Sequence, residues 1–148
     1  MEASGKRYSE VSIGQTFRQS VQVTEAHLSL GATLIGDFNP LHVDETFARR
    51  SRYGSRILHG VITSAIIGAP AGMVFAGTAI GYLEHNCRFL GPVRIGDTLA
   101  TVWTVTALED KPKHGGGVVR MSAQCVNQRG ERIAEATGAM LVKDAMIA

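Results

Sequence analysis

GVITSAIIGA, residues 60–69, is small or apolar at nearly every position and carries no charge. We predict a helix that begins near Gly60 and runs at least to Gly68. A helix without a polar face must be buried, so the rest of the chain has to surround it.

The second half of the chain is predicted to form a series of strands that cover this helix. YLEHNCRFL (82–90) alternates between apolar and polar residues, which is the pattern of a half-buried strand. We expect one face of this strand to carry Leu83, His85, Cys87 and Phe89. Further strands are predicted over residues 98–108, 118–127 and 132–142, with a hairpin turn in NQRG (127–130).

The first half of the chain mixes strand and helix. FRQSVQV (17–23) has strand character, Thr24 offers an N-cap for a helix over 25–35 that Gly36 ends, and a short helix is predicted at about 45–50. Helices followed by consecutive strands indicate an α+β fold with an antiparallel sheet, which we expect to wrap around the helix at 60–69. No linker divides the chain, so a single domain is expected over residues 1–148.

Composition narrows the classes of function. The net charge is only +2 and no dense Lys/Arg run occurs, so no nucleic-acid partner is expected. The apolar stretch at 61–76 is interrupted by Thr63, Ser64 and Pro70 and is shorter than the roughly 20 residues of a membrane span, so no membrane partner is expected. The N-terminus shows no secretory signal, and both cysteines are expected to be reduced and buried, which fits a cytoplasmic protein.

A candidate site lies in GDFNPLH (36–42). Pro40 stiffens the backbone of this loop, so Asp37 and His42, five residues apart, can converge on one point. A carboxylate beside an imidazole is a common acid/base pair near neutral pH. The alternative is an ordinary polar turn, which Asp37 caps while His42 packs beneath it.

A second motif favours the catalytic interpretation. ILHGV (57–61) places His59 and Gly60 at the predicted start of the buried helix, where backbone N–H groups lack partners and attract an oxygen that carries negative charge. Because glycine lets a ligand approach the backbone closely, the Gly60 N–H is a candidate oxyanion donor. His59 by itself is expected to be a core histidine that fixes the helix start.

Two further possibilities concern metals and phosphates. His42, Asp44 and another histidine lack the spacing of known metal-binding motifs, so no metal is expected. A basic cluster precedes ILHGV and comprises Arg49, Arg50, Arg52 and Arg56. This cluster is either a solvated face or a contact for the phosphates of a nucleotide-bearing substrate, which the forked donors of arginine favour.

With these residues in place, the chain resembles the MaoC-like (R)-specific enoyl-CoA hydratases of the hotdog fold. The similarity runs through VTEAHLSLGATLIGDFNPLHVDETFA (23–48), ILHGV (57–61) and GPVRIGDTL (91–99), and it includes SIGQTF (12–17). It covers nearly the whole chain, and GDxNPLHxDxxFA is a specific signature. The resemblance implies a five-stranded antiparallel sheet wrapped around a long central helix. It also implies a homodimer or higher homo-oligomer, with acyl-CoA bound near the subunit interface.

The same resemblance implies roles for individual residues. The catalytic Asp and His of the family fall on Asp37 and His42, and its backbone oxyanion donor falls on Gly60. Asn39 matches a residue that helps to hold the loop and a bound water. Gly68 is a departure, because some members carry there a Ser that lines the acyl pocket. The substrate-binding set is then expected to comprise Asn39, His59, Arg56 and Gly68.

The reaction implied is the reversible hydration of a trans-2-enoyl-CoA to an (R)-3-hydroxyacyl-CoA, with water as the second substrate and no metal or redox cofactor. The Gly60 N–H would polarise the thioester carbonyl, and Asp37 and His42 would hold the water that adds to the β-carbon. A hotdog acyl-CoA thioesterase is one alternative, although such enzymes usually present a carboxylate near the central helix and GVITSAIIGA has none. A non-catalytic acyl-CoA-binding module is the other.

Overall fold

The buried helix predicted at 60–69 forms α4 (Gly60–Val74) in a computed structural model, which describes residues 5–147. It begins at Gly60, as predicted, and continues beyond Gly68 and through the buried Pro70. Trp103 is fully buried and donates its Nε1–H to the Ile67 carbonyl at 2.8 Å, which fastens the helix to the sheet. The central helix therefore packs against the strands, as its apolar composition requires.

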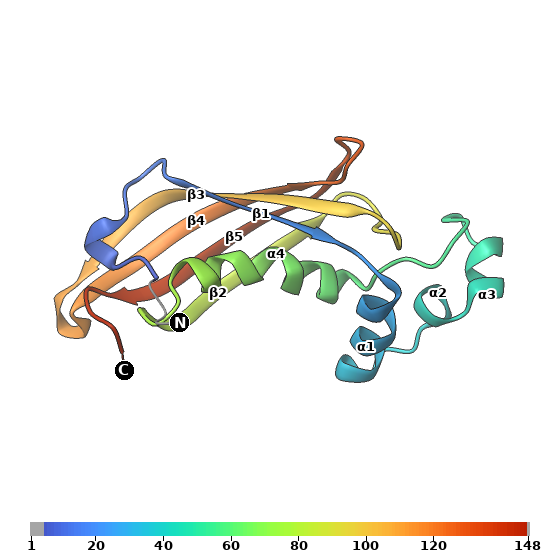
Figure 1. The fold of residues 1–148 in the computed structure, drawn as a ribbon, viewed down its shortest axis with the longest axis horizontal. Coiled ribbons are helices and arrows are strands. Elements are labelled where there is room, and N and C mark those ends of the chain that lie inside the picture. Colours follow the sequence, from blue (N-terminus) through green and yellow to red (C-terminus); the bar gives the residue numbers. More distant parts are fainter. Residues whose placement is uncertain (1–4, 148) are drawn as a thin grey trace.

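A single antiparallel sheet of five strands lies against this helix (Figure 1). The strands are β1 (Thr16–Gln22), β2 (Ala79–Phe89), β3 (Thr98–Lys111), β4 (Gly116–Val126) and β5 (Arg132–Lys143). Their order in the sheet is β1-β3-β4-β5-β2, so β1 and β2 are the edge strands. The hairpin predicted at 127–130 joins β4 to β5, and its Gly130 N–H donates to the Asn127 carbonyl at 3.0 Å. These findings confirm the predicted α+β class and the sheet around the helix.

Strand β2 differs from the sequence prediction in one respect. His85 and Phe89 contact α4 as expected, but Tyr82 rather than Leu83 joins them on this face. The reason is a β-bulge: Tyr82 pairs with Met140 and Glu84 with Ala139, so Leu83 is the extra residue and is 56% exposed. The prediction that Leu83 lies on the inner face was therefore wrong.

The remaining helices gather at one end of the molecule (Figure 1). They are α1 (Glu25–Ile35), α2 (Pro40–Val43) and α3 (Glu45–Arg50). Within residues 5–147, no helix has the length and apolar character that crossing a membrane requires.

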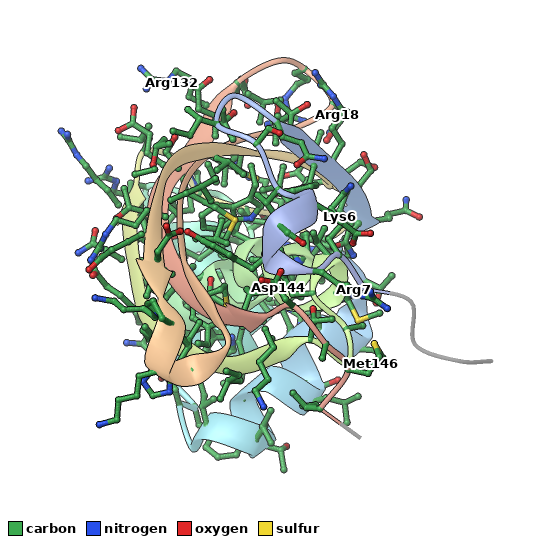
Figure 2. All side chains as sticks on the ribbon, turned by 90° about the vertical axis from the view of Figure 1, so that its left-hand side faces the viewer. Lys6, Arg7, Arg18, Arg132, Asp144 and Met146 are labelled. Carbon is green, nitrogen blue, oxygen red and sulfur yellow. The ribbon has the colours of Figure 1, made fainter. Side chains whose placement is uncertain are left out.

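The first and last described residues lie at the opposite end, which Figure 2 views directly, and there Lys6, Arg7 and Asp144 lie around the 3₁₀ turn η1 (Tyr8–Glu10). A second 3₁₀ turn, η2 (Pro112–His114), joins β3 to β4. The Lys6 N–H donates to the Val74 carbonyl at 2.8 Å, and the Ser9 N–H donates to Asp144 Oδ1 at 2.6 Å. The terminal segments thus close the C-terminal end of α4, while its N-terminal end points toward α1, α2 and α3.

Candidate active site

The loop between α1 and α2 is held by short-range hydrogen bonds from backbone N–H groups to side-chain oxygens. Gly36 ends α1 in the left-handed conformation, with φ of 72°, which favours glycine. Asp37 Oδ1 accepts the Asn39 N–H at 3.1 Å, and Asn39 Oδ1 in turn accepts the Leu41 N–H at 3.0 Å. Asn39 is the N-cap of α2, and Pro40 occupies its first turn. GDFNPLH is therefore a rigid turn followed by one helical turn, and Asn39 supports the loop.

His42 is oriented by a backbone carbonyl. Its Nδ1 lies 2.7 Å from the Ile57 carbonyl oxygen, which can only accept, so Nδ1 carries the proton. In the neutral ring Nε2 then has a free lone pair, and it faces Asp37 Oδ2 at 3.8 Å. The structure thus brings the predicted pair together, at a separation too long for a direct hydrogen bond.

His59 lies behind this pair and has no exposed surface. Its Nε2 donates to the Asp37 backbone carbonyl at 2.9 Å, which ties the loop to the start of α4. Its ring also stacks on the His42 ring, with centroids 3.9 Å apart. Within residues 5–147 no hydrogen bond satisfies His59 Nδ1. His59 is thus a core histidine, as predicted, but among the described residues its side chain makes no cap hydrogen bond at the start of α4 and instead contacts the Asp37 carbonyl and the His42 ring.

Gly60 opens α4, and its N–H has no hydrogen-bond partner among the described residues. It lines, together with His42, a cavity of about 390 Å³ that we call the loop pocket. Arg52, Tyr53 and residues 89–93 form other parts of the wall. A Cβ placed on Gly60 would lie in van der Waals contact with the Phe89 ring, at 3.4 Å, so a side chain here would take space from the pocket. An unpaired donor beside an imidazole can stabilise negative charge on a bound oxygen.

A second hollow follows α4 away from the loop pocket. This helix groove has a volume of about 480 Å³ and is open on one side. It is lined by Val61, Ser64 and Gly68 from α4 and by Tyr82 and His85 from β2. Gly68, predicted as a substrate-binding residue, thus lies in the helix groove and not in the loop pocket.

The structure gives Arg56 a different environment from the one predicted. Its guanidinium binds both carboxylate oxygens of Glu25, at 2.8 and 2.6 Å, and Glu45 Oε2 at 3.1 Å. These hydrogen bonds raise the pKa of Arg56 and lower the pKa of both glutamates. Two carboxylates already neutralise this arginine, so its geometry supports a structural ion pair between α1 and α3 and not a substrate contact. Arg52 is the member of the basic cluster that lines the loop pocket.

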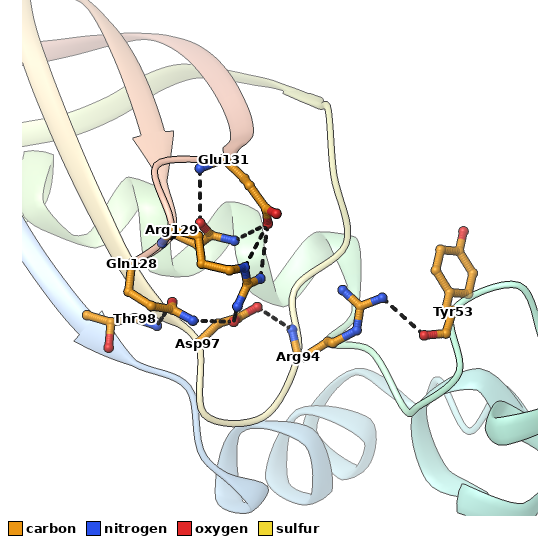
Figure 3. Close-up of polar contacts among 8 residues, drawn as sticks. Tyr53, Arg94, Asp97, Thr98, Gln128, Arg129 and Glu131 are labelled. Carbon is orange, nitrogen blue, oxygen red and sulfur yellow. Dashed lines mark hydrogen bonds and ion pairs between the residues drawn. The ribbon is translucent and has the colours of Figure 1, made fainter.

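A buried carboxylate stiffens the far wall of the loop pocket, and the sequence did not single it out. Asp97 is 3% exposed, and it accepts from the Arg94 N–H and the Gln128 side chain, each at 2.9 Å (Figure 3). Arg129 adds an ion pair to Asp97 at 3.3 Å, and the Arg94 guanidinium donates to the Tyr53 carbonyl at 3.0 Å. This network joins the 91–97 connector to the segment before α4. The Asp after Gly96 in RIGD was the available signal.

The same site raises the question of a metal. Asp37, His42 and His59 each place a potential ligand atom within 4.8 Å of the others. However, His42 Nδ1 and His59 Nε2 donate to carbonyls and therefore carry protons, which excludes them as ligands. His59 Nδ1 belongs to a ring without exposed surface, so only Asp37 Oδ2 and His42 Nε2 offer lone pairs to the site. Two such atoms suit a proton-transfer pair better than a metal centre.

A five-stranded antiparallel sheet around a central helix is the hotdog fold, and here a carboxylate and an imidazole meet at the start of that helix. The chain belongs to the MaoC-like family: the family described as "MaoC like domain" matches residues 9–133. The structure is similar to that of R-hydratase PhaJ1 from Pseudomonas aeruginosa in its unliganded form, with a TM-score of 0.81 and 31% identity. That match covers 94% of this chain and 86% of the other.

Two relatives agree with this assignment. An (R)-specific enoyl-CoA hydratase from Rhodospirillum rubrum is 33% identical over 106 residues, which are 72% of this chain and 74% of that protein. An (R)-specific enoyl-CoA hydratase from Aeromonas caviae is 35% identical over 103 residues, which are 69% of this chain and 77% of that protein.

Proposed function

We propose that this chain catalyses the reversible hydration of a trans-2-enoyl-CoA to an (R)-3-hydroxyacyl-CoA. The family and the names of the relatives support an enzyme of the hydratase or dehydratase class. One observation carries the finer proposal: His42 Nε2 and Asp37 Oδ2 face each other across 3.8 Å, and His42 shares a pocket with the free Gly60 N–H.

A water molecule held by Asp37 and His42 is the nucleophile of this proposal. The 3.8 Å separation suits a bridging water, which Asp37 Oδ2 orients by accepting one of its hydrogen atoms. Because His42 Nδ1 carries the proton, Nε2 can accept the other as the water oxygen adds to the β-carbon. The pair then returns a proton to the α-carbon, so that one water is added across the double bond.

Gly60 stabilises the charge that develops during this addition. The thioester oxygen would accept the Gly60 N–H, which has no partner among the described residues. This hydrogen bond draws electron density from the β-carbon and stabilises the enolate that forms when water adds. The start of α4 adds the favourable field of a helix N-terminus. Arg52, at the rim of the loop pocket, is our candidate for a contact with the CoA phosphates.

We further propose that the enzyme is a homodimer. β2 is an edge strand, and Ile80, Tyr82 and Leu83 leave large apolar side chains exposed on it. Val61 and Met73 are 60% and 70% exposed on the adjacent α4. An apolar edge of this kind favours pairing with a second copy of the chain. Such a copy would also close the open side of the helix groove.

A thioesterase and a non-catalytic binding module would each give a different outcome with the same acyl-CoA. A thioesterase would release free CoA thiol, but α4 carries no carboxylate along its length. A binding module would bind acyl-CoA and leave it unchanged, yet it would have no use for the aligned Asp37, His42 and Gly60.

One assay separates the three activities. Enzyme is mixed with crotonyl-CoA, and the loss of enoyl absorbance is followed alongside the release of free thiol. The proposal predicts loss of absorbance without thiol release, and dehydration of (R)-3-hydroxybutyryl-CoA in the reverse direction. Thiol release at the same rate would identify a thioesterase, and binding without either change would identify a binding module.

A further inference from the structure

The helix groove contains a chain of polar side chains that the proposed mechanism does not use. Ser64 Oγ lies 2.8 Å from His85 Nε2, and Tyr82 Oη lies 2.9 Å from His85 Nδ1. All three residues line the groove, whose remaining walls are alanines, glycines and Val61. A Cβ on Gly68 would lie 3.4 Å from His85 Cε1 and 3.5 Å from Tyr82 Oη. The glycine therefore keeps the space in front of these groups open.

Ser64, His85 and Tyr82 together carry one more donor hydrogen than their mutual hydrogen bonds use. A neutral histidine has one N–H and one lone pair, and each hydroxyl has one hydrogen. Three donors thus serve two internal hydrogen bonds, which leaves one hydroxyl hydrogen free, on Ser64 or on Tyr82. The nearby Cys87 thiol, which contacts Ser64, is only a weak acceptor. Tyr82 is 40% exposed and the groove is open on one side, so water can accept the spare hydrogen until a ligand and a second copy of the protein exclude it.

The groove is also uncharged. Its lining residues include no Asp, Glu, Lys or Arg. Burial lowers the pKa of His85 and raises the pKa of Tyr82, so both are neutral at neutral pH. A carboxylate placed here would lose its hydration without gaining a cation, which is costly. A neutral oxygen that accepts one hydrogen bond fits this environment better.

We propose that the helix groove selects acyl chains that carry an uncharged oxygen, a hydroxyl or keto group, beyond the reacting carbons. The inference rests on the proposed function, in which the thioester binds at Gly60 and a second copy of the protein closes the groove. Ser64 lies one helical turn from Gly60, about 6 Å along the axis, so the oxygen would sit a few carbons beyond the β-carbon. Once the second copy proposed above closes the open side of the groove, a plain alkyl chain would leave the spare hydroxyl hydrogen without water or any other partner, and that disfavours it.

The test compares three enoyl-CoA substrates of equal chain length: a plain alkyl chain, a chain with a terminal hydroxyl, and a chain with a terminal carboxylate. We expect kcat/KM for the hydroxyl substrate to exceed that for the alkyl substrate by about tenfold. The variant carrying both Ser64→Ala and Tyr82→Phe should lower this ratio toward one. Ser29→Ala removes a serine from the exposed surface of α1, outside both hollows, and should keep the wild-type ratio.

Three results would overturn the inference. The wild type could prefer the alkyl chain, it could prefer the carboxylate, or the double variant could keep the wild-type ratio and lose only thermal stability. The last result would show that the hydrogen bonds among Ser64, His85 and Tyr82 only hold β2 against α4.

Failure of the proposed function looks different, because no enoyl-CoA would then be hydrated. Calorimetric titration with the saturated hydroxyacyl-CoA and acyl-CoA of equal length still decides the groove's preference in that case. Tighter binding of the hydroxylated ligand by the wild type, and not by the double variant, would uphold the inference. Equal binding of the two ligands would refute it.

Discussion

His42 and His59 divide two tasks between neighbouring rings. The Ile57 carbonyl fixes the proton on His42 Nδ1 and thereby leaves the Nε2 lone pair free for the water of the proposed reaction. His59 faces no solvent and acts through the groups it touches, the Asp37 carbonyl and the His42 ring. We therefore treat His59 as a positioning residue and Asp37 and His42 as the groups that contact water.

Substitution of His59 tests this division. His59→Phe keeps a flat ring against His42 but removes the hydrogen bond to the Asp37 carbonyl, so the loop loses its anchor to α4. We expect kcat to fall by roughly tenfold or more with little change in KM, because small displacements of a catalytic group cost rate. Steady-state kinetics on crotonyl-CoA measures both parameters.

His59→Gln provides the matched control. Its amide N–H can reach the position of Nε2 and restore the donor, so part of the lost kcat should return. Equal kcat in the Phe and Gln variants would show that the hydrogen bond has no role in positioning Asp37.

Among the elements, the three short helices depend on an ion pair for their arrangement. Glu25 stands in the first turn of α1 and Glu45 in the first turn of α3, and Arg56 joins them from the segment before α4. Negative charge in a first helical turn is also favoured by the helix dipole. Arg56 therefore joins α1 and α3, the helices on either side of the segment that carries Asp37 and His42.

Replacing Arg56 should weaken the fold in a pH-dependent way. Hydrogen bonds from Arg56 lower the pKa of Glu25 and Glu45, so their stabilising effect is present above the ordinary glutamate pKa and is lost as pH falls through the lowered values. Arg56→Met should unfold at a lower temperature than the wild type at pH 7, and the difference should shrink below about pH 4. Thermal melts across this range check the prediction. Arg50→Met, in the exposed last turn of α3, should show no such trend.

The helix α1 and the strand β2 show which features of the fold can be predicted from local sequence. The bounds of α1 could be predicted because Thr24 and Gly36 are local signals at its two ends. The face of β2 could not, because the bulge that exposes Leu83 depends on pairing with β5. Asp37 and His42 could be predicted as a pair because they lie only five residues apart in the sequence. RIGD marks Asp97 as a turn residue, but the partners of Arg56 and Asp97 lie on segments far apart in the chain, and no local pattern indicates those partners.

At the scale of the whole molecule, the edge strand β2 exposes apolar side chains and, within the described part of the chain, has no neighbouring strand on its outer side. The opposite edge, β1, exposes mostly polar side chains along its length. The apolar residues of β2 border the helix groove, so a second copy seated there would complete the substrate site as well as the sheet.

A charge placed on this edge should separate the protomers. We expect the wild type to have about twice the 15.8 kDa chain mass in solution, because an isologous contact at β2 pairs two copies. Leu83→Lys would place an amine at this edge and should shift the protein to the mass of one chain. Light scattering after size exclusion measures the mass. Ile13→Lys, at an exposed apolar residue before β1, should remain a dimer. A wild type with the mass of one chain would contradict the proposed dimer.

The most direct test uses Asp37→Asn. Asparagine can keep the hydrogen bond from the Asn39 N–H and hence the loop, so the substitution removes the carboxylate charge and little else. We predict that kcat for the hydration of crotonyl-CoA falls by roughly 100-fold or more, while the melting temperature stays close to that of the wild type. A folded Asp37→Asn enzyme that hydrates crotonyl-CoA at the wild-type rate would contradict the assignment of Asp37 and His42 as the pair that activates water.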